Sequence, residues 1–139
     1  MIRNFPPKYY MIFTDSPYDK MYRNRIIAGL RIALTLLMEE YDVYVLLLQQ
    51  SAVLSQVPDA NDEVKMKEAM AQEEDPEEIN FTPFELIEAL ISFGGEVITC
   101  KSSLTMCGLT KDDMMEGMNL YTLHTAMMKM VDCDKVFTF

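Results

Sequence analysis

The chain has 139 residues, half of them apolar, which suffices for one domain (1–139) with a hydrophobic core that needs no disulfide or structural metal. Its formal net charge of −10 argues against direct binding to nucleic acid, because basic side chains supply most of that affinity. The three cysteines contain no CxxC pair, so we expect free thiols in a reducing compartment.

The apolar segments are too short or too interrupted to enter a membrane. Residues 1–13 contain charged residues and prolines and lack the continuous apolar stretch of a signal peptide. The longest apolar region, residues 26–38, contains Arg31 and falls short of the roughly 20 residues that span a bilayer. We therefore predict a cytoplasmic protein that does not contact membranes.

The first part of the chain predicts a strand, a helix and a second strand. Residues 8–14 (KYYMIFT) form an aromatic and β-branched run followed by turn-forming residues. Between residues 21 and 40, apolar side chains recur every three or four positions, and Ile32 and Leu36 widen this face. This pattern predicts a helix buried on more than one side. Residues 43–48 (VYVLLL) are apolar without alternation, as in a strand of a parallel sheet covered on both faces.

A long acidic segment follows, which we interpret as an insertion at about residues 55–81. It contains Pro58, Pro76 and the acidic run 73–75, and residues 61–72 favour a polar helix. Because the segment leaves the sheet from the same edge as the expected site, it could cover that site.

The second part of the chain continues the alternation of helices and strands. Thr82 is expected to cap a helix, with Pro83 in its first turn and Glu85 completing a capping box, and Gly94 and Gly95 end it. Further elements follow: a strand at 96–100, a short helix starting at 110–113, a strand at 118–121, a helix at 124–131 and a strand at 135–139. The whole pattern predicts a three-layer α/β/α sandwich with a five-stranded, mostly parallel sheet.

In such a sheet the loops that follow the strands gather at one edge, where ligands bind. Cys100 ends a strand at this edge, and Lys101, Ser102 and Ser103 follow it in what can be a helical turn. Helix-terminal amides or a nearby cation would favour the thiolate. From position alone, a reactive thiol and a small buried side chain remain equally open interpretations.

Other candidates carry weaker signals. Cys107 could resolve an oxidised Cys100, whereas Cys133 lies between two aspartates near a helix end and is expected to be structural. His124, the only histidine, could act as a base or only bond locally. Ser16 could cradle an anion in the first edge loop. The acidic residues at 112, 113 and 116 have no histidine partner and are interpreted as charges of a helix start, so no metal site is predicted.

Residues 95–139 resemble the DsrE/DsrF-like family. In that family a strand ends in a cysteine, a short helix and a glycine follow, and a later glycine and leucine precede the last helix. The matching residues here are Cys100, Gly108, Gly117 and Leu120, and the chain closes on the family-like run DKVFTF at 134–139. The first strand, the long helix and the loop with Ser16 and Tyr18 also look like the family. This sequence departs from the family just before the glycine, where Met106 and Cys107 stand in place of basic residues.

The resemblance implies a five-stranded parallel sheet, assembly into trimers or hexamers, and a persulfide on the cysteine matching Cys100. We therefore predict a small homo-oligomeric sulfur-transfer protein without metal or organic cofactor, exchanging sulfur with donor and acceptor proteins. Lys101 and the amides of Ser102 and Ser103 would stabilise the thiolate. The thirteen methionines are expected partly in the core and partly in a subunit interface. The alternatives are a non-catalytic oligomeric binding module and a redox sensor that uses Cys100 with Cys107.

Overall fold

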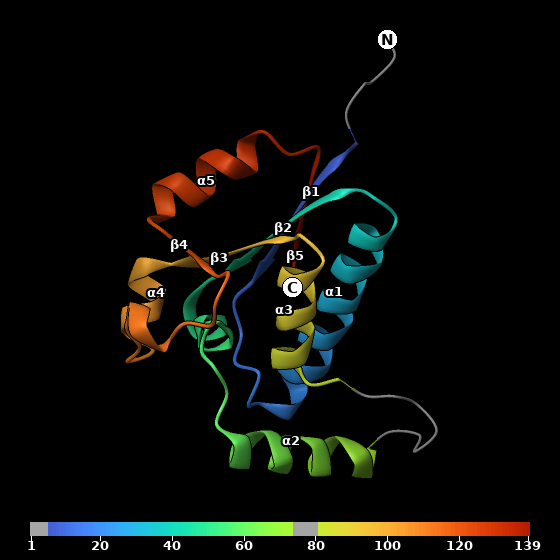
Figure 1. Cartoon of the computed structure of the whole chain (residues 1–139), viewed down its shortest axis with the longest axis vertical. Coiled ribbons are helices and arrows are strands. Elements are labelled where there is room, and N and C mark those ends of the chain that lie inside the picture. The colour runs from blue at the N-terminus through green and yellow to red at the C-terminus, as the bar shows by residue number, and fades with distance from the viewer. Residues whose placement is uncertain (1–5, 74–80) are drawn as a thin grey trace.

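Five parallel strands form the centre of the molecule, for which the computed structural model describes residues 6–73 and 81–139 (Figure 1). The strands are β1 (Lys8–Phe13), β2 (Asp42–Leu47), β3 (Glu96–Cys100), β4 (Asn119–Tyr121) and β5 (Lys135–Thr138). Their order in the sheet is β4-β3-β2-β1-β5, and every neighbouring pair is parallel. The predicted five-stranded sheet is confirmed, and it is entirely parallel.

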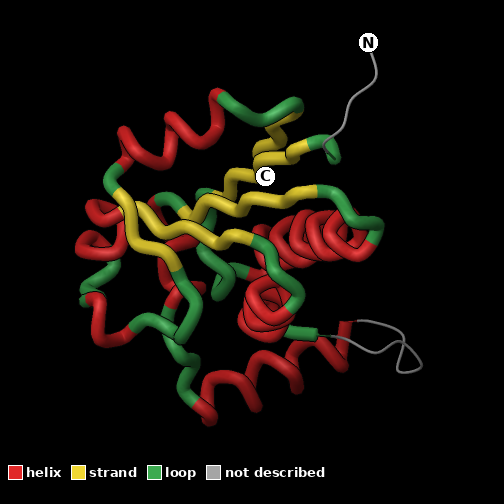
Figure 2. Tube along the Cα trace, turned by 45° about the horizontal axis from the view of Figure 1, so that its top comes forward, coloured by secondary structure: helices red, strands yellow, loops and turns green. Residues whose placement is uncertain are grey.

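Helices cover both faces of this sheet, which confirms the three-layer arrangement (Figure 2). The helices are α1 (Lys20–Met38), α2 (Ala60–Glu73), α3 (Pro83–Ser92), α4 (Lys101–Met106) and α5 (Leu123–Val131), with short 3-10 turns η1 (Gln49–Ser55) and η2 (Lys111–Asp113). α1 and α3 lie on one face and α5 on the other. Within the described residues, none of the helices combines the length and the apolar character needed to cross a membrane.

The larger core lies between the sheet and the layer of α1 and α3. α1 contributes Ile26, Leu30 and Ala33 to it, and strand residues such as Val45 face them. The expectation that α1 is buried on more than one side is wrong, because Ile32 is 48% exposed. α1 lies in the outer layer of the sandwich, so only the side that faces the sheet and α3 is covered.

A smaller core fills the opposite face of the sheet, beneath α5. Ala126 of α5 packs there with Tyr10, Leu46 and Ile98 from three neighbouring strands. The Tyr10 hydroxyl donates a 2.8 Å hydrogen bond to the carbonyl of Ala126, which fixes the helix to the sheet. Burial, together with the nearby Cys133 and Glu96, raises the pKa of Tyr10, so this donor stays protonated.

The predicted polar helix in the acidic segment is confirmed as α2, which packs by two methionines. Met66 and Met70 are buried in the larger core, and the Thr82 hydroxyl donates a 2.7 Å bond to the Glu63 carboxylate. α2 therefore packs beside α3 at the bottom of Figure 1, away from α4, the helix whose N-cap is Cys100. The rest of the acidic segment, residues 74–80, lies outside the described residues.

Two capping boxes are present, and the first of them was predicted. The Glu85 amide donates to the Thr82 hydroxyl at 3.2 Å, and the Thr82 amide donates to the Glu85 carboxylate at 3.1 Å. In the second box the Thr110 amide donates to Asp113 at 2.7 Å. Only a single 3-10 turn follows Thr110, so the short helix expected there is wrong in length, while the interpretation of Asp113 as a helix-start charge is confirmed.

The connections after β3 and β4 leave the sheet in opposite directions. Between β3 and β4 the chain passes on the α1 and α3 side, where Met115 joins the larger core. Gly117 adopts a φ of +89° there, and a Cβ at this position would lie 2.5 Å from Ile91 of α3. After β4, α5 crosses the other face. Adjacent strands with diverging connections mark the place where open α/β sheets form a ligand crevice.

Candidate functional site

Cys100 lies at this point of divergence, as the last residue of β3 and the N-cap of α4. Its neighbour across the sheet is Tyr121, the last residue of β4. The side chain of Cys100 is only 2% exposed. The thiol is therefore at the expected edge of the sheet, but it is covered by the elements around it.

Hydrogen-bond donors from the first turn of α4 surround the Cys100 sulfur. The Ser102 hydroxyl lies 3.2 Å from Sγ. Burial alone would raise the pKa of the Cys100 thiol. Hydrogen bonds from the hydroxyls and backbone amides of Ser102 and Ser103 outweigh the effect of burial, so the pKa of Cys100 is lowered. The serines that follow Cys100 in the sequence therefore supply the groups that lower its pKa, whereas Lys101, which was expected to contribute, is not one of them.

Ser103 is held in place by the loop after β2. The Gln49 amide donates a 2.8 Å hydrogen bond to the Ser103 hydroxyl oxygen, and Ser103 is buried. Because this bond occupies an acceptor position of the oxygen, the hydroxyl proton stays available for the neighbouring Cys100. Gln49 has a φ of +50°, an uncommon conformation for a residue with a side chain. Gln49 thus links β2 to the thiol site.

Cys107 contacts the same loop residue from the other end of α4. Its thiol donates a 3.3 Å bond to the Gln49 carbonyl oxygen, and burial raises the pKa of Cys107. The residue is the C-cap of α4 and Cys100 is its N-cap. Their Cα atoms are consequently separated by roughly 10 Å along the helix axis. A disulfide requires about 4.4–6.8 Å between Cα atoms, so these two thiols can join only if α4 unwinds.

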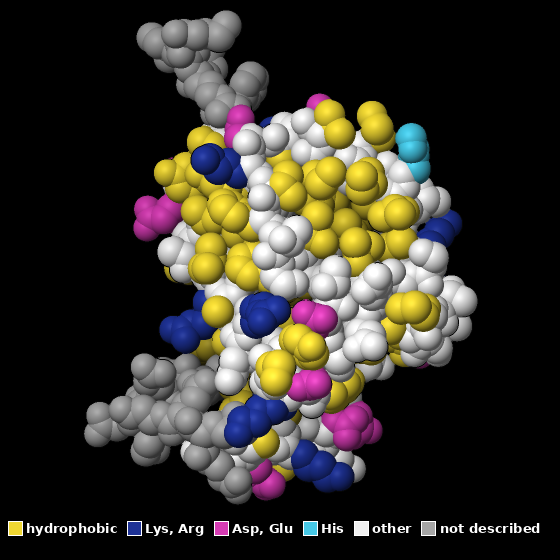
Figure 3. Space-filling model, turned by 180° about the vertical axis from the view of Figure 1, so that it is seen from behind, with side chains coloured by type: hydrophobic (Ala, Val, Ile, Leu, Met, Phe, Trp, Pro, Cys, Tyr) yellow, Lys and Arg dark blue, Asp and Glu magenta, His cyan; other side chains and the backbone are white. Residues whose placement is uncertain are grey.

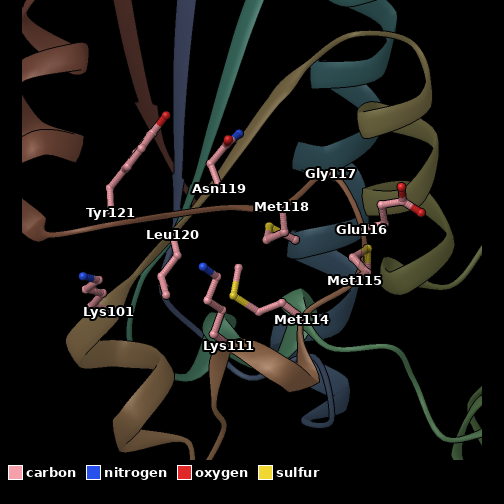
Figure 4. Close-up of a pocket in the computed structure, with 10 residues that line it drawn as sticks. All are labelled: Lys101, Lys111, Met114, Met115, Glu116, Gly117, Met118, Asn119, Leu120 and Tyr121. Carbon is pink, nitrogen blue, oxygen red and sulfur yellow. The ribbon is translucent and has the colours of Figure 1, made fainter.

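A cavity of about 570 Å³ opens along β4 (Figure 4), and Cys100 itself does not belong to its lining. It begins at Lys101 and Tyr121, the chain neighbour and the sheet neighbour of the cysteine, and follows β4. Its lining is Lys101, Lys111, Met114, Met115, Glu116, Gly117, Met118, Asn119, Leu120 and Tyr121. The cavity combines two cationic side chains with an apolar wall of methionine and leucine.

The remaining predicted site residues lie outside this cavity lining. His124 is exposed in the first turn of α5. Ser16 accepts a 3.2 Å bond from the Tyr18 amide within its own loop. Tyr18 lines a different cavity, beside α2, and its ring is 6.3 Å from that of Phe84. The structure therefore places Lys101, Ser102 and Ser103 next to Cys100. His124, Ser16 and Tyr18 lie elsewhere and do not belong to this site.

Cys133 occupies a third environment, under α5. Its thiol donates a 3.4 Å bond to the Lys129 carbonyl, and it packs against the smaller core. Burial raises the pKa of Cys133 and nearby aspartates add to this effect, with Lys8 opposing them. These contacts agree with the structural role expected from the sequence.

Sequence analysis missed several residues of the site, among them Gln49, Lys111 and Met114. The φ of Gln49 carries no sequence signal, because residues with positive φ are usually glycine or asparagine. Lys111 lies in the segment 110–113, which was interpreted as a helix start. Nothing in that pattern indicated that the Lys111 side chain lines a cavity.

Comparisons with known proteins agree on the fold and the family. The model of the DsrE/DsrF-like family matches residues 7–139. An uncharacterized protein of Methanocaldococcus jannaschii is 29% identical over 133 residues, covering 95% of this chain and 99% of that protein. Another uncharacterized protein, from Methanopyrus kandleri, is 28% identical over 129 residues, covering 93% of this chain and 91% of that protein.

Two solved structures share the fold. The ychN protein from E. coli superimposes with a TM-score of 0.72 at 19% identity, over 96% of this chain and 99% of that one. A protein of unknown function from Methanobacterium thermoautotrophicum gives a TM-score of 0.57 at 13% identity, over 95% of this chain and 98% of that one.

Proposed function

The chain belongs to the DsrE/DsrF-like family, and from this premise we propose that it is a small cytoplasmic sulfur-transfer protein that holds a persulfide on Cys100. Family membership indicates a function related to sulfur relay. The observation that carries the finer proposal is the set of donors around the Cys100 sulfur, led by the Ser102 hydroxyl at 3.2 Å, which lowers the pKa of the thiol. The thiolate is the form of cysteine that attacks sulfur.

The reaction is an exchange between sulfur atoms without net oxidation. The Cys100 thiolate attacks the outer sulfur of a donor persulfide, a new S–S bond forms, and the old S–S bond breaks. Its electron pair leaves with the donor as a thiolate. An acceptor thiolate then attacks the outer sulfur of the Cys100 persulfide, and Cys100 returns to its starting thiolate. The donors on Ser102 and Ser103 stabilise the Cys100 thiolate both before sulfur is loaded and after it is released.

Incubation with a persulfide donor, followed by intact-mass measurement, tests the proposal. The wild type should gain the mass of one sulfur atom, Cys100→Ser should gain none, and Cys107→Ser should behave like the wild type. Absence of the gain in the wild type, or an equal gain in Cys100→Ser, would refute the persulfide carrier. A reversible loss of the mass of two hydrogen atoms that needs both Cys100 and Cys107 would favour the redox sensor, although α4 separates the two thiols.

The second candidate is a non-catalytic binding module of the same fold. The near-complete burial of Cys100, at 2% exposure, together with the neighbouring cavity of about 570 Å³, favours this alternative. In that case a ligand would bind to the Cys100→Ser variant as it binds to the wild type, and no sulfur would be transferred.

We also propose that the protein is a homo-oligomer, a trimer or a hexamer. α5 and β5 expose several apolar side chains, namely Leu123, Met127, Met128, Val131, Val136 and Phe137. Figure 3 shows hydrophobic side chains gathered over the upper half of the face that is turned away in Figure 1. Soluble monomers rarely expose such groups together. Light scattering after size exclusion should give a multiple of the chain mass, and Met128→Glu should lower it; a monomeric wild type would contradict the proposal.

A further inference from the structure

The cavity beside Cys100 has the position of a ligand site. It lies between β4 and Lys101, the residue that follows β3, and the connections of these two adjacent strands diverge to opposite faces of the sheet. Its volume of about 570 Å³ falls within the range of small-molecule sites. We propose that it binds a small anionic organic thiol or its persulfide, which exchanges sulfur with Cys100. This inference rests on the proposed function and names the class of its substrate.

The charge of the ligand follows from the lysines of the lining. Lys101 and Lys111 are both exposed, and neither forms an ion pair with another side chain in the described part of the chain. Glu116 is the one acidic residue of the lining, and Figure 4 shows its carboxylate directed towards α3, away from both lysines. The end of the cavity next to Cys100 therefore favours a carboxylate or a sulfonate.

The organic part of the ligand follows from the wall between the lysines and Glu116. Figure 4 shows Met114 and Leu120 pointing into the same space as the Lys111 side chain, with Met118 above them. An inorganic sulfur anion would leave this apolar surface uncovered and would occupy only a small part of the volume. A carbon skeleton that carries the anionic group would cover the methionines and bury apolar surface.

The burial of Cys100 favours a small molecule over a protein as the direct reactant. Cys100 is 2% exposed and is not among the residues that line the cavity, so the surrounding structure must shift before any reactant reaches its sulfur. A small molecule bound next to Lys101 and Tyr121 requires a smaller shift than a cysteine on a folded partner. A ligand in the cavity lies beside Lys101 and Tyr121, which flank Cys100 along the chain and across the sheet. The Cys100 thiolate would attack the outer sulfur of the bound persulfide, and the organic thiolate would leave with the electron pair of the broken S–S bond.

The charge requirement is tested with a matched pair of donors, the persulfides of N-acetylcysteine and of its neutral amide. The rate of sulfur loading, followed by intact mass, should be higher for the anionic donor. Lys111→Gln and Lys101→Gln should each reduce the ratio of the anionic-donor rate to the amide-donor rate about five-fold, because only the anionic donor gains an ion pair with these lysines. Lys135→Gln, which removes the same charge from β5 at the opposite edge of the sheet, is the matched control and should load like the wild type.

A binding measurement separates this inference from the proposed function. N-acetylcysteine, added to the Cys100→Ser variant, should shift the methyl NMR signals of Met114 and Met118, while Met21 and Met38 on α1 stay unchanged. If Cys100 loads from inorganic polysulfide but discriminates neither donor charge nor lysine variant, and no methyl signal moves, the small-molecule inference is wrong and the carrier function stands. If no donor loads Cys100, the carrier function fails, and the inference about its substrate fails with it.

Discussion

Replacing Ser103 by alanine should weaken both the thiol site and the fold. The Ser103 hydroxyl accepts the Gln49 amide at 2.8 Å and donates to Cys100. Without it, the partly buried Gln49 amide loses its partner, which costs about 1–2 kcal/mol of unfolding free energy. The pKa of Cys100 should rise, because one donor to the thiolate is gone while burial, which opposes the charge, remains.

The sign of the pH dependence follows from the lowered pKa of Cys100. The folded protein releases the thiol proton more easily than the unfolded chain, whose thiol titrates at its ordinary value of 9.0. The stability contributed by this group is therefore fully present above pH 9.0 and is lost as the pH falls through the lowered folded value. Ser103→Ala should reduce this rise of stability with pH.

The assay uses a background in which Cys100 is the only thiol, with Cys107→Ser and Cys133→Ala. Thiolate absorbance against pH gives the pKa of Cys100, and urea unfolding gives the stability. Ser102→Ala is the matched control, because Ser102 is exposed and has no bond to Gln49. It should raise the pKa with a stability change within about 0.5 kcal/mol. An unchanged pKa in Ser103→Ala, or equal stability losses in both variants, would refute the account of Ser103.

Substitutions at three further positions test other contacts of the structure. Thr99→Val should stabilise the protein by about 1 kcal/mol in urea unfolding, since the buried Thr99 hydroxyl has no hydrogen-bond partner among the residues that the structure describes; a loss of stability would show that the hydroxyl is satisfied. Cys107→Ala should cost about 1 kcal/mol through the lost bond to the Gln49 carbonyl, Cys107→Ser should cost less, and sulfur loading of Cys100 should persist in both. Gly117→Ala should destabilise by at least about 1 kcal/mol, because φ is +89° and the new Cβ would lie 2.5 Å from Ile91; an unchanged urea midpoint would contradict this.

Local sequence patterns predicted the strand end and the donors around Cys100. The run EVITC is apolar and β-branched, and the following KSS suits the first turn of a helix, so both β3 and the amides that face the thiol depend on neighbouring residues only. Capping at Thr82 is equally local and was predicted for the same reason. Interactions between residues close in the chain leave a readable signal in the sequence.

Contacts between distant segments were not predictable in this way. The burial of Cys100 and the bond from Gln49 to Ser103 depend on a loop 54 positions away in the chain. The Cys107 thiol bonds to that same loop, over 58 positions, so its role in anchoring Gln49 could not be recognised. The exposure of Ile32 has a related cause, because periodicity identifies an apolar face without showing whether another layer covers it.

The methionines divide between the core and the surface, so their expected place in the core is confirmed and their place in a subunit interface stays a prediction. Some are buried in the core, namely Met11, Met66, Met70 and Met115, and others are exposed, namely Met21, Met38, Met106, Met127 and Met128. The two buried methionines of α2, Met66 and Met70, explain how a largely polar helix packs beside α3. The exposed pair on α5 belongs to the surface for which we propose subunit contacts.

A pulse and chase of sulfur on Cys100 tests the central claim most directly. The protein is loaded from a persulfide donor, separated from it, and mixed with an excess of an acceptor thiol, and its intact mass is followed over time. The account predicts a gain of one sulfur atom that peptide mapping locates on Cys100, followed by return to the original mass as the acceptor gains the sulfur. A sulfur that is located on Cys107 or Cys133, or that stays on the protein throughout the chase, would contradict it.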